Sequence, residues 1–312
     1  MSHRLALLFP GQGAQTVGMG EALTQQFAVA AEVFSEADEA LQFKLSALCF
    51  AGPEDDLRLT ANAQPAILAT SIAALRVLEH ETDLRPVCVA GHSLGEYTAL
   101  VAAGALSFAD ALRTVRERGR LMQEAVPAGV GSMAALMGLS PQAVAEVCQE
   151  AAQGQLVSPA NINGGAQVVV AGHAEAVRRA VEVAKTRGAK RALELAVSAP
   201  FHCDLMAPAA DGLRQVLASL AVQTLSLALI PNVTAQPHQD PDRVKPLLFQ
   251  QVTAPVRWEE SMHQLRPLGC QAAVEIGPGR VLSGLLKRID SGIPCASFGQ
   301  PGHLGAVQGL LA

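Results

Sequence analysis

The sequence predicts an α/β protein with a large domain built on a parallel sheet and a smaller domain inserted into it. Short apolar runs, each closed by glycine, proline, asparagine or serine, alternate with longer helical stretches, as in sheets buried on both faces. Half of the residues are hydrophobic and only 4% are aromatic, so alanine, valine and leucine must form the core. The length of 312 residues exceeds one minimal core, which favours an inserted second domain.

Four apolar runs are expected to form buried strands of the parallel sheet: residues 5–9, 87–90, 225–230 and 272–276. Ligands of such sheets bind beyond the carboxyl ends of the strands. The segments that follow the runs are therefore the candidate site segments: residues 10–13, 91–95, 231–234 and 277–279.

The pattern changes between residues 128 and 199. We expect strands at 133–137, 156–162, 167–171 and 190–197, with helices at 141–152 and 174–187. This β-α-β-β-α-β order is that of the ferredoxin-like unit. The expected division is a large domain of residues 1–127 and 200–312, a small domain of residues 128–199, and a cleft between them.

Composition argues against several classes of protein. The net charge is −5 and the 23 lysines and arginines are scattered, so the basic patch that nucleic-acid binding needs is missing. The six cysteines are widely spaced, without Cys-x-x-Cys pairs or histidines at zinc spacing, so we expect reduced thiols and no metal site. Only five apolar residues precede Pro10, too few for a signal peptide or a membrane span. We expect a cytoplasmic protein without membrane contact.

Residues 91–95, Gly-His-Ser-Leu-Gly, match the Gly-x-Ser-x-Gly turn that exposes a serine nucleophile between a strand and a helix. The required context is present, because an apolar run precedes Ser93 and a helical stretch from Glu96 to residue 103 follows it. The alternative, a plain Gly-Ser loop, does not require this context. We therefore expect Ser93 to be a nucleophile.

A serine needs a neighbouring base, usually a histidine. His92 is expected to point away from Ser93. Six other histidines lie at polar or chain-end positions, where solvated side chains are expected: His3, His80, His173, His238, His263 and His303. His202 differs, because it follows the strand expected to end at residue 197, where the small domain returns to the large one. We expect His202 to be the base.

An oxyanion hole requires donors aimed at the developing charge. The amide of Leu94 follows the nucleophile directly, and the amide of Gln12 follows the first strand. The glycines near Gln12 also suggest a dinucleotide loop, but Thr16 occupies the last glycine position of that pattern, which disfavours this alternative.

Arg118 lies on a helix that Ser107 and Asp110 open as a capping box. The other charged residues of the helix share one side, expected to face solvent: residues 113, 116, 117, 120 and 124. Arg118 falls on the opposite, apolar flank, and a buried guanidinium needs an anion. The helical pattern leaves open whether a protein carboxylate, the commoner case, or a substrate supplies it.

Taken together, these segments resemble the malonyl-CoA:acyl carrier protein transacylases. The matching segments are residues 9–15, 91–97, 118, 161, 198–202 and 275–278. The similarity runs from the first expected strand to the last, in the same order. It implies an α/β-hydrolase-like large domain with a ferredoxin-like insert.

The resemblance also implies roles for residues. Ser93 would be the nucleophile, His202 the base, and the Gln12 and Leu94 amides the oxyanion hole. Arg118 would bind the malonyl carboxylate through two hydrogen bonds.

Three further positions follow from the same resemblance. The main-chain carbonyl of Gln251 would orient the base in place of an aspartate. Asn161 aligns with a polar residue of the cleft. Phe201 resembles the malonyl-type pattern, because a bulky ring there leaves little room for a branch on the α-carbon of the acyl group.

The resemblance implies an acyltransferase that moves a malonyl group from malonyl-CoA to the phosphopantetheine thiol of acyl carrier protein in fatty-acid biosynthesis, through an acyl-serine intermediate. No cofactor or metal is expected, and the expected oligomeric state is a monomer. Alternatives remain: a serine esterase or thioesterase, a free-standing acyltransferase of a polyketide or malonate-utilisation pathway, or a catalytically idle docking partner of a synthase complex.

Overall fold

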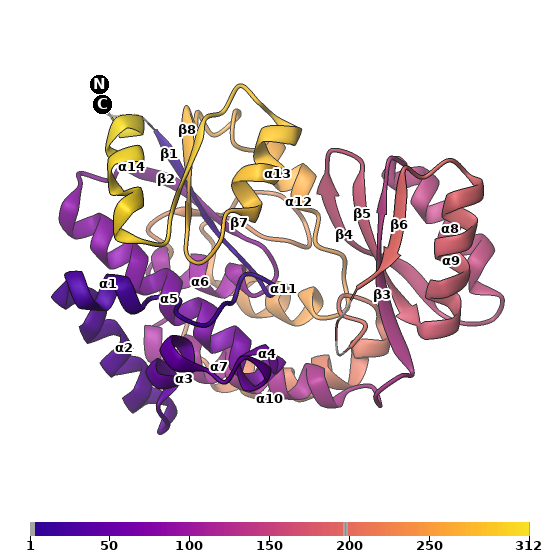
Figure 1. The fold of residues 1–312 in the computed structure, drawn as a ribbon, viewed down its shortest axis with the longest axis horizontal. Helices are drawn as coiled ribbons and strands as arrows, with labels where there is room; N and C mark the ends of the chain where they lie inside the picture. The colour runs from indigo at the N-terminus through magenta and orange to yellow at the C-terminus, as the bar shows by residue number, and fades with distance from the viewer. Residues whose placement is uncertain (1–3, 196, 198, 312) are drawn as a thin grey trace.

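The computed structural model describes residues 4–195, 197 and 199–311, which form two separate sheets and their helices (Figure 1). The larger sheet is parallel, in the order β7-β2-β1-β8-β9. Its strands are β1 (Leu5–Phe9), β2 (Pro86–Gly91), β7 (Ala228–Ile230), β8 (Ala272–Ile276) and β9 (Cys295–Phe298). The smaller sheet is antiparallel, in the order β4-β5-β3-β6. Its strands are β3 (Gly131–Met137), β4 (Val157–Gly164), β5 (Gln167–His173) and β6 (Arg191–Glu194). The expected α/β class with a parallel sheet is confirmed.

Helices cover both faces of the parallel sheet. The helices before β3 are α1 (Glu21–Gln26), α2 (Ala28–Leu41), α3 (Leu45–Ala51), α4 (Glu54–Arg58), α5 (Thr60–Glu81), α6 (Gly95–Ala102) and α7 (Phe108–Glu124). Those after β6 are α10 (Ala207–Ser219), α11 (Val244–Gln251), α12 (Trp258–His263), α13 (Val281–Ile289) and α14 (Leu304–Leu311). Three 3-10 turns span Asp204–Met206, Pro241–Arg243 and Pro301–His303. One face of the sheet packs against α5, α6 and α7, and the other against α12 and α13.

The strand β1 illustrates why an unbroken apolar run belongs in this sheet. Successive side chains of a strand point to opposite faces. Leu7 and Phe9 join the core beneath α5 and α6, whereas Ala6 and Leu8 join the core beneath α12 and α13. Both faces of the strand are therefore buried, which is the condition that the sequence pattern indicated.

The smaller sheet carries α8 (Pro141–Ala152) and α9 (Ala174–Thr186) on one face, around a core of its own. The order β3-α8-β4-β5-α9-β6 is the expected one. In Figure 1 this part lies to the right of the parallel sheet. Where the two domains should be divided stays a prediction.

Three strands differ clearly from expectation. The run 225–230 forms a strand only from Ala228, because the amides of Gln223 and Ser226 donate to carbonyls after α6 instead of to β2. The edge strand β9 was not expected, since its segment is short and holds no β-branched residue. The expected strand 190–197 shortens to β6, and residue 196 lies outside the described residues.

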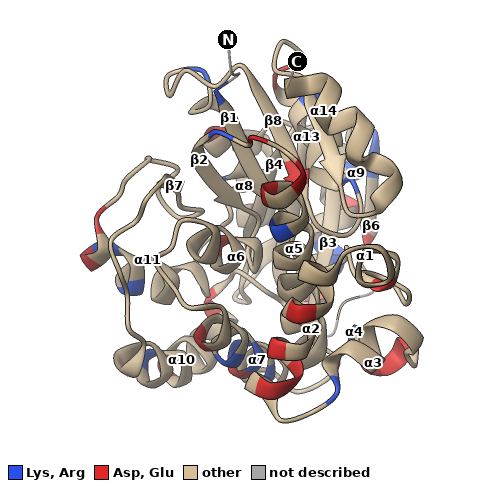
Figure 2. Cartoon of the chain, turned by 90° about the vertical axis from the view of Figure 1, so that its left-hand side faces the viewer, with Lys and Arg blue, Asp and Glu red and all other residues tan. Residues whose placement is uncertain are grey.

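The solvent face of α7 carries interleaved charges, as Figure 2 shows. Arg113 pairs with Asp110, and Arg120 pairs with both Glu117 and Glu124. Ser107 caps the helix by accepting from the amide of Asp110, as expected. Arg118 is consequently the odd cation of this helix, because it points the other way and is 1% exposed.

Two further findings concern the expectations about membrane spans and cysteines. No helix in the described ranges is long and apolar enough to cross a membrane. All six cysteines carry free thiols, although the sulfurs of Cys88 and Cys270 lie 3.5 Å apart.

Candidate active site

The turn between β2 and α6 exposes Ser93 through two close backbone approaches. A Cβ on Gly91 would lie 1.9 Å from the carbonyl of Gly95, and a Cβ on Gly95 would lie 2.1 Å from the carbonyl oxygen of Phe9. Only glycine fits at these two positions. Ser93 itself has a φ of 52°, in the left-handed region that non-glycine residues seldom adopt. The turn therefore has the strained geometry of a nucleophile elbow.

His202 lies directly against this serine. The hydroxyl of Ser93 lies 2.7 Å from His202 Nε2, and His202 Nδ1 lies 2.8 Å from the main-chain oxygen of Gln251. A carbonyl oxygen can only accept, so Nδ1 carries the proton and Nε2 is free to accept the serine proton. The arrangement is that of a serine, a base and a main-chain group that orients the base.

The surroundings of His202 favour its neutral form. Burial lowers its pKa to about 3, and the nearby charge of Arg118 acts in the same direction. His202 is 3% exposed, so water screens little of this effect. The imidazole is therefore unprotonated at neutral pH and can accept a proton.

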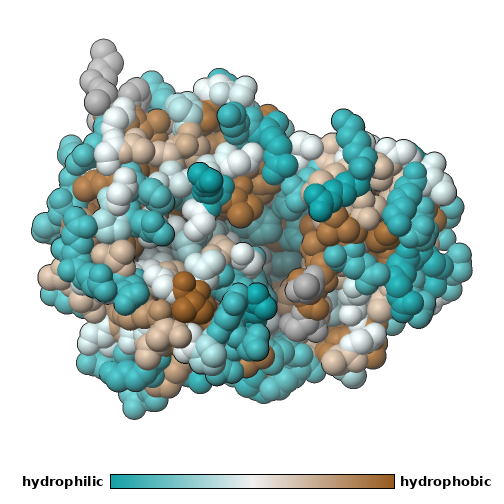
Figure 3. All heavy atoms as spheres, in the orientation of Figure 1, coloured by the Kyte–Doolittle hydropathy of each residue, from teal (hydrophilic) through white to brown (hydrophobic). Residues whose placement is uncertain are grey.

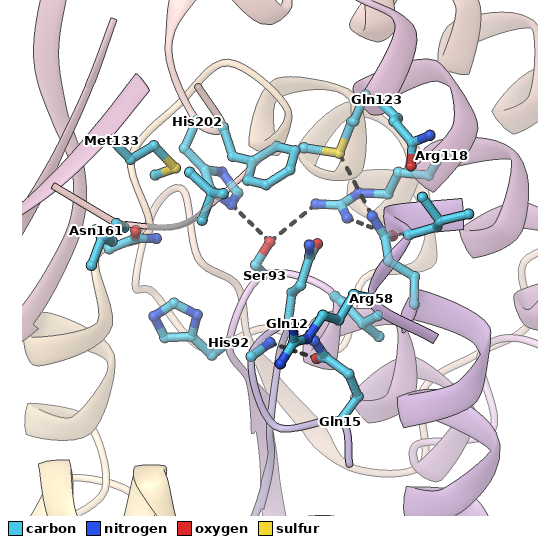
Figure 4. Close-up of a pocket in the computed structure, with 18 of the residues that line it drawn as sticks. Gln12, Gln15, Arg58, His92, Ser93, Arg118, Gln123, Met133, Asn161 and His202 are labelled. Carbon is cyan, nitrogen blue, oxygen red and sulfur yellow. Dashed lines mark hydrogen bonds between the residues drawn. The ribbon is translucent and has the colours of Figure 1, made fainter. Parts of the chain in front are cut away.

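The guanidinium of Arg118 reaches the same hydroxyl from the other side (Figure 4). Its Nη2 donates to Ser93 Oγ over 3.1 Å and to Gln251 Oε1 over 3.0 Å, and its Nη1 donates to Gln64 Oε1 over 2.7 Å. Each of these acceptors is neutral. Within the described chain, the ion pairs of α7 belong to Arg113 and Arg120, and Arg118 has none. A buried cation thus points into the site without a bonded anion.

A network beneath the serine holds its main chain. Asn232 Oδ1 accepts from the Ser93 amide over 2.7 Å, and Gln251 Nε2 donates to the Ser93 carbonyl over 3.0 Å. Both residues contact the buried carboxylate of Glu96. The sequence indicated Asn232 only as a residue that follows an expected strand. Sequence analysis did not identify Gln64 or Glu96 as site residues, although Glu96 is the one charged residue in the first turn of the helix α6.

The site opens into a cavity of about 450 Å³, within the usual range of ligand pockets. Its lining includes Gln12, Leu94, Asn161 and Phe201, so the expected site residues converge on it. Gln251 lies behind them, fully buried. Further lining residues come from the part of the chain around the parallel sheet and from the smaller sheet with the segment after it. They are Gln15, Asp55, Arg58, Leu59, Met133, Leu195 and Val197. Figure 3 shows the surface hollowed between the larger and the smaller part.

Two of these residues have side-chain contacts that bear on their roles. The side chain of Gln12 donates to Thr60 Oγ1 over 3.2 Å, which fixes it at the cavity wall. Asn161 is 8% exposed and forms a β-bridge with Val256, which joins β4 to the segment before α12. The oxyanion roles of Gln12 and Leu94 remain predictions, as does any role for Asn161. Ser198 lies outside the described residues.

Among the other histidines that the structure describes, none forms a hydrogen bond with Ser93 or His202, and one differs from expectation. His92 turns away from Ser93, and its Nε2 lies 2.9 Å from Asn163 Oδ1 on β4. His238, expected in solvent, is only 8% exposed, because its backbone pairs with Leu229 beside β7. Among the described residues, no cluster of three histidine, cysteine, aspartate or glutamate side chains could hold a metal ion.

Comparisons with known proteins agree with this geometry. Residues 6–295 match the family model described as acyl transferase domain. The malonyl CoA-acyl carrier protein transacylase of Bacillus subtilis is 48% identical over 299 residues, which cover 96% of this chain and 94% of that protein. The solved acyl-carrier-protein-S-malonyltransferase of Bartonella henselae superimposes with a TM-score of 0.95, at 48% identity, over 99% of both chains. A malonyl-transacylase solved in complex with a type II polyketide-synthase acyl-carrier protein gives a TM-score of 0.95, at 44% identity, over 97% of this chain and 98% of that one.

Proposed function

The chain belongs to the acyl transferase family, and from this premise we propose that it moves a malonyl group from malonyl-CoA to the phosphopantetheine thiol of acyl carrier protein, in fatty-acid biosynthesis. One observation carries the choice of a malonyl group. Arg118 is buried beside the Ser93 hydroxyl, and its hydrogen-bond acceptors are neutral. A substrate carboxylate would supply the directly bonded anion that Arg118 lacks among the described residues.

The chemistry is a double displacement. Ser93 Oγ attacks the thioester carbonyl while His202 Nε2 takes the hydroxyl proton, and the oxyanion forms beside the Leu94 and Gln12 amides. Collapse of the tetrahedral adduct breaks the carbon–sulfur bond, and His202 returns the proton to the departing coenzyme A thiolate. The thiol of the carrier protein then attacks the acyl-serine by the same steps, with His202 again as base, and leaves as the malonyl thioester.

The charge of a bound malonyl carboxylate would also change the pKa of the base, His202. Arg118 depresses the pKa of His202, and a carboxylate bound at Arg118 offsets this charge. The base becomes stronger when a malonyl group is in place. The correct substrate thereby assists its own transfer, whereas acetyl-CoA, which has no carboxylate, does not.

The walls of the cavity support a malonyl group over a branched one. Phe201 is 8% exposed and lines the cavity one residue before the base. Its ring restricts the space beside the α-carbon, so a methylmalonyl group should be disfavoured. Asn161 is a candidate polar contact for the same group.

The proposed function also carries expectations about cellular compartment, oligomeric state and partner. We assign the chain to the cytoplasm, where thiols such as its six free cysteines stay reduced. We expect it to act as a monomer, without a cofactor, and to meet acyl carrier protein as a transient partner.

Product analysis separates this proposal from hydrolysis by the same serine. Malonyl-CoA is incubated with the protein, with and without carrier protein, and free malonate and malonyl-carrier are both measured. We expect malonyl-carrier to form much faster than malonate. Equal malonate release under both conditions would identify a thioesterase instead.

A further inference from the structure

Glu96 is a buried carboxylate that the proposed mechanism leaves without a task. It lies in the first turn of α6, three residues after Ser93, and is 0% exposed. Its Oε2 accepts from the Asn232 amide over 2.9 Å and from Gln251 Nε2 over 2.8 Å. A carboxylate this deep is costly to bury, so its contacts point to a task.

Both residues that Glu96 contacts also hold the main chain of the nucleophile. Asn232 accepts from the Ser93 amide, and its own Nδ2 donates to the carbonyl of Gly91 over 2.7 Å. Gln251 donates to the Ser93 carbonyl. The strained φ of Ser93 is thus held on both sides by residues that share one carboxylate.

Gln251 also connects this carboxylate to the substrate-facing cation. Its amide nitrogen donates to Glu96, and its amide oxygen accepts from Arg118 Nη2. The negative and positive side chains are therefore separated by one neutral amide. Burial raises the pKa of Glu96 to about 7, while the hydrogen bonds from Asn232 and Gln251 and the charge of Arg118 oppose this effect.

We propose that Glu96 is a positioning residue with two effects: it fixes the main chain of Ser93 through Asn232 and Gln251, and it serves as the resident counter-charge of Arg118. The second effect rests on the proposed malonyl specificity. An incoming carboxylate must share Arg118 with Glu96, and two anions near one cation repel each other. Glu96 thus keeps Arg118 from binding the malonyl group too tightly for its onward transfer.

Two substitutions separate charge from position. Glu96→Gln removes the charge but keeps an oxygen that can accept from Asn232 and Gln251. Glu96→Asp keeps the charge but draws it back from both partners. Glu275→Gln is the matched control, because Glu275 is equally buried but accepts from the amides of Leu282 and Ser283, away from the cavity.

The measurement is single-turnover loading of the full chain by malonyl-CoA and by acetyl-CoA, at about pH 8.5, where Glu96 of the wild type is mostly ionised. For Glu96→Gln we expect the half-saturating concentration of malonyl-CoA to fall about tenfold, while that of acetyl-CoA stays unchanged. The maximal rates with both donors should stay close to those of the wild type, because the amide oxygen of the new side chain still accepts from Asn232 and Gln251, which hold the main chain of Ser93.

The other two variants complete the test. Glu96→Asp should lose about tenfold in both maximal rates and keep the wild-type half-saturating concentrations. Glu275→Gln should lower the melting temperature and leave all four loading parameters unchanged. These rates distinguish a positioning role from general destabilisation.

Contrary results are equally specific. A parallel change of both half-saturating concentrations in Glu96→Gln would overturn the counter-charge role, and wild-type maximal rates in Glu96→Asp would overturn the positioning role. If the wild-type protein takes no malonyl group at all, the proposed function fails instead. The rates with acetyl-CoA then still decide whether Glu96 positions the nucleophile.

Discussion

A buried guanidinium next to a buried, neutral imidazole gives this site its electrostatic character. Arg118 and His202 are 1% and 3% exposed, and both contact the hydroxyl of Ser93. The cation makes protonation of the imidazole unfavourable, and neither side chain is screened by water. The two residues can therefore be tested separately, one through substrate choice and the other through pH.

Arg118→Ala should change which acyl group the protein accepts. Losing a charge-assisted, two-point contact should cost malonyl loading about 3 kcal/mol, or about a hundredfold, and leave acetyl loading unchanged or improved. The ratio of the two loading rates is the readout, and Arg120→Ala on the solvent face of α7 is the control. If both rates and the melting temperature fall together in Arg118→Ala, the arginine has a structural task and the malonyl contact lies elsewhere.

His202 should make folding stability depend on pH. Its pKa in the folded protein is about 3, against 6.5 for the free side chain. Between these two values the imidazole is protonated in the unfolded chain but not in the folded one. Stability is lost as the pH falls through this window. Between about pH 6.5 and 4.5 the wild type should lose about 2 kcal/mol more of its free energy of unfolding than His202→Asn does.

Chemical denaturation at both pH values measures the difference between the two proteins, and other titrating groups cancel in it. An equal loss in the wild type and in His202→Asn would mean that His202 is protonated in the folded state.

The sequence could predict the residues whose type and local pattern are both distinctive. Ser93 stands in a recognisable turn, and Arg118 occupies the wrong face of an amphipathic helix. Gln64 and Glu96 could not be found in this way, because their importance depends on contacts with residues brought together from distant segments. Gln251 came from resemblance alone, as a main-chain group. Its side chain contacts Ser93, Glu96 and Arg118 as well.

At the scale of elements, the junction of β2 and α6 is the part of the fold least tolerant of change. Gly91→Ala would place a Cβ 1.9 Å from the backbone of Gly95, so strand and helix must separate. We expect a loss of about 3 kcal/mol or more in the free energy of unfolding. Gly284→Ala is the matched control, since a Cβ there meets nothing within 4 Å in the helix α13.

The control should be neutral or stabilising by up to about 1 kcal/mol, because alanine favours a helix more than glycine does. Urea denaturation of the two variants measures the difference between them. Comparable stability of Gly91→Ala and Gly284→Ala would contradict the account of the junction.

Elements were predictable where local pattern and tertiary context agree. The strand β1, the strand β8 and the helix α8 were expected with the bounds that they have. The strand β7 is shorter because the preceding loop bonds to the segment after α6, and β9 is held by its neighbour β8 more than by its own residues. Such pairings between distant segments leave no mark on the local sequence.

At the scale of the whole molecule, a net charge of −5 repels an acidic carrier protein unless a local basic patch attracts it. Lys190 and Arg191 beside the small sheet, with Lys287 and Arg288 on α13, are exposed candidates, and none of the four forms an ion pair within the described part of the chain. Arg288 reaches Gln167 of β5 over 3.4 Å, so its side chain lies next to the small sheet.

Reversing these four charges should raise the Michaelis constant for carrier protein about tenfold and leave that for malonyl-CoA unchanged. Steady-state kinetics with each substrate varied in turn measures both constants. Arg178→Glu, on α9 of the small sheet, serves as the control for a charge change outside the patch. Equal effects on both constants would reject this docking surface.

The most direct test of the whole account is the intact mass of the protein after incubation with malonyl-CoA. We expect the wild type to gain one malonyl group, Ser93→Ala to gain none while keeping its melting temperature, and holo carrier protein to remove the group from the wild type and acquire its mass. A malonyl adduct on Ser93→Ala, or a wild-type adduct that the carrier protein cannot discharge, would contradict transfer through Ser93.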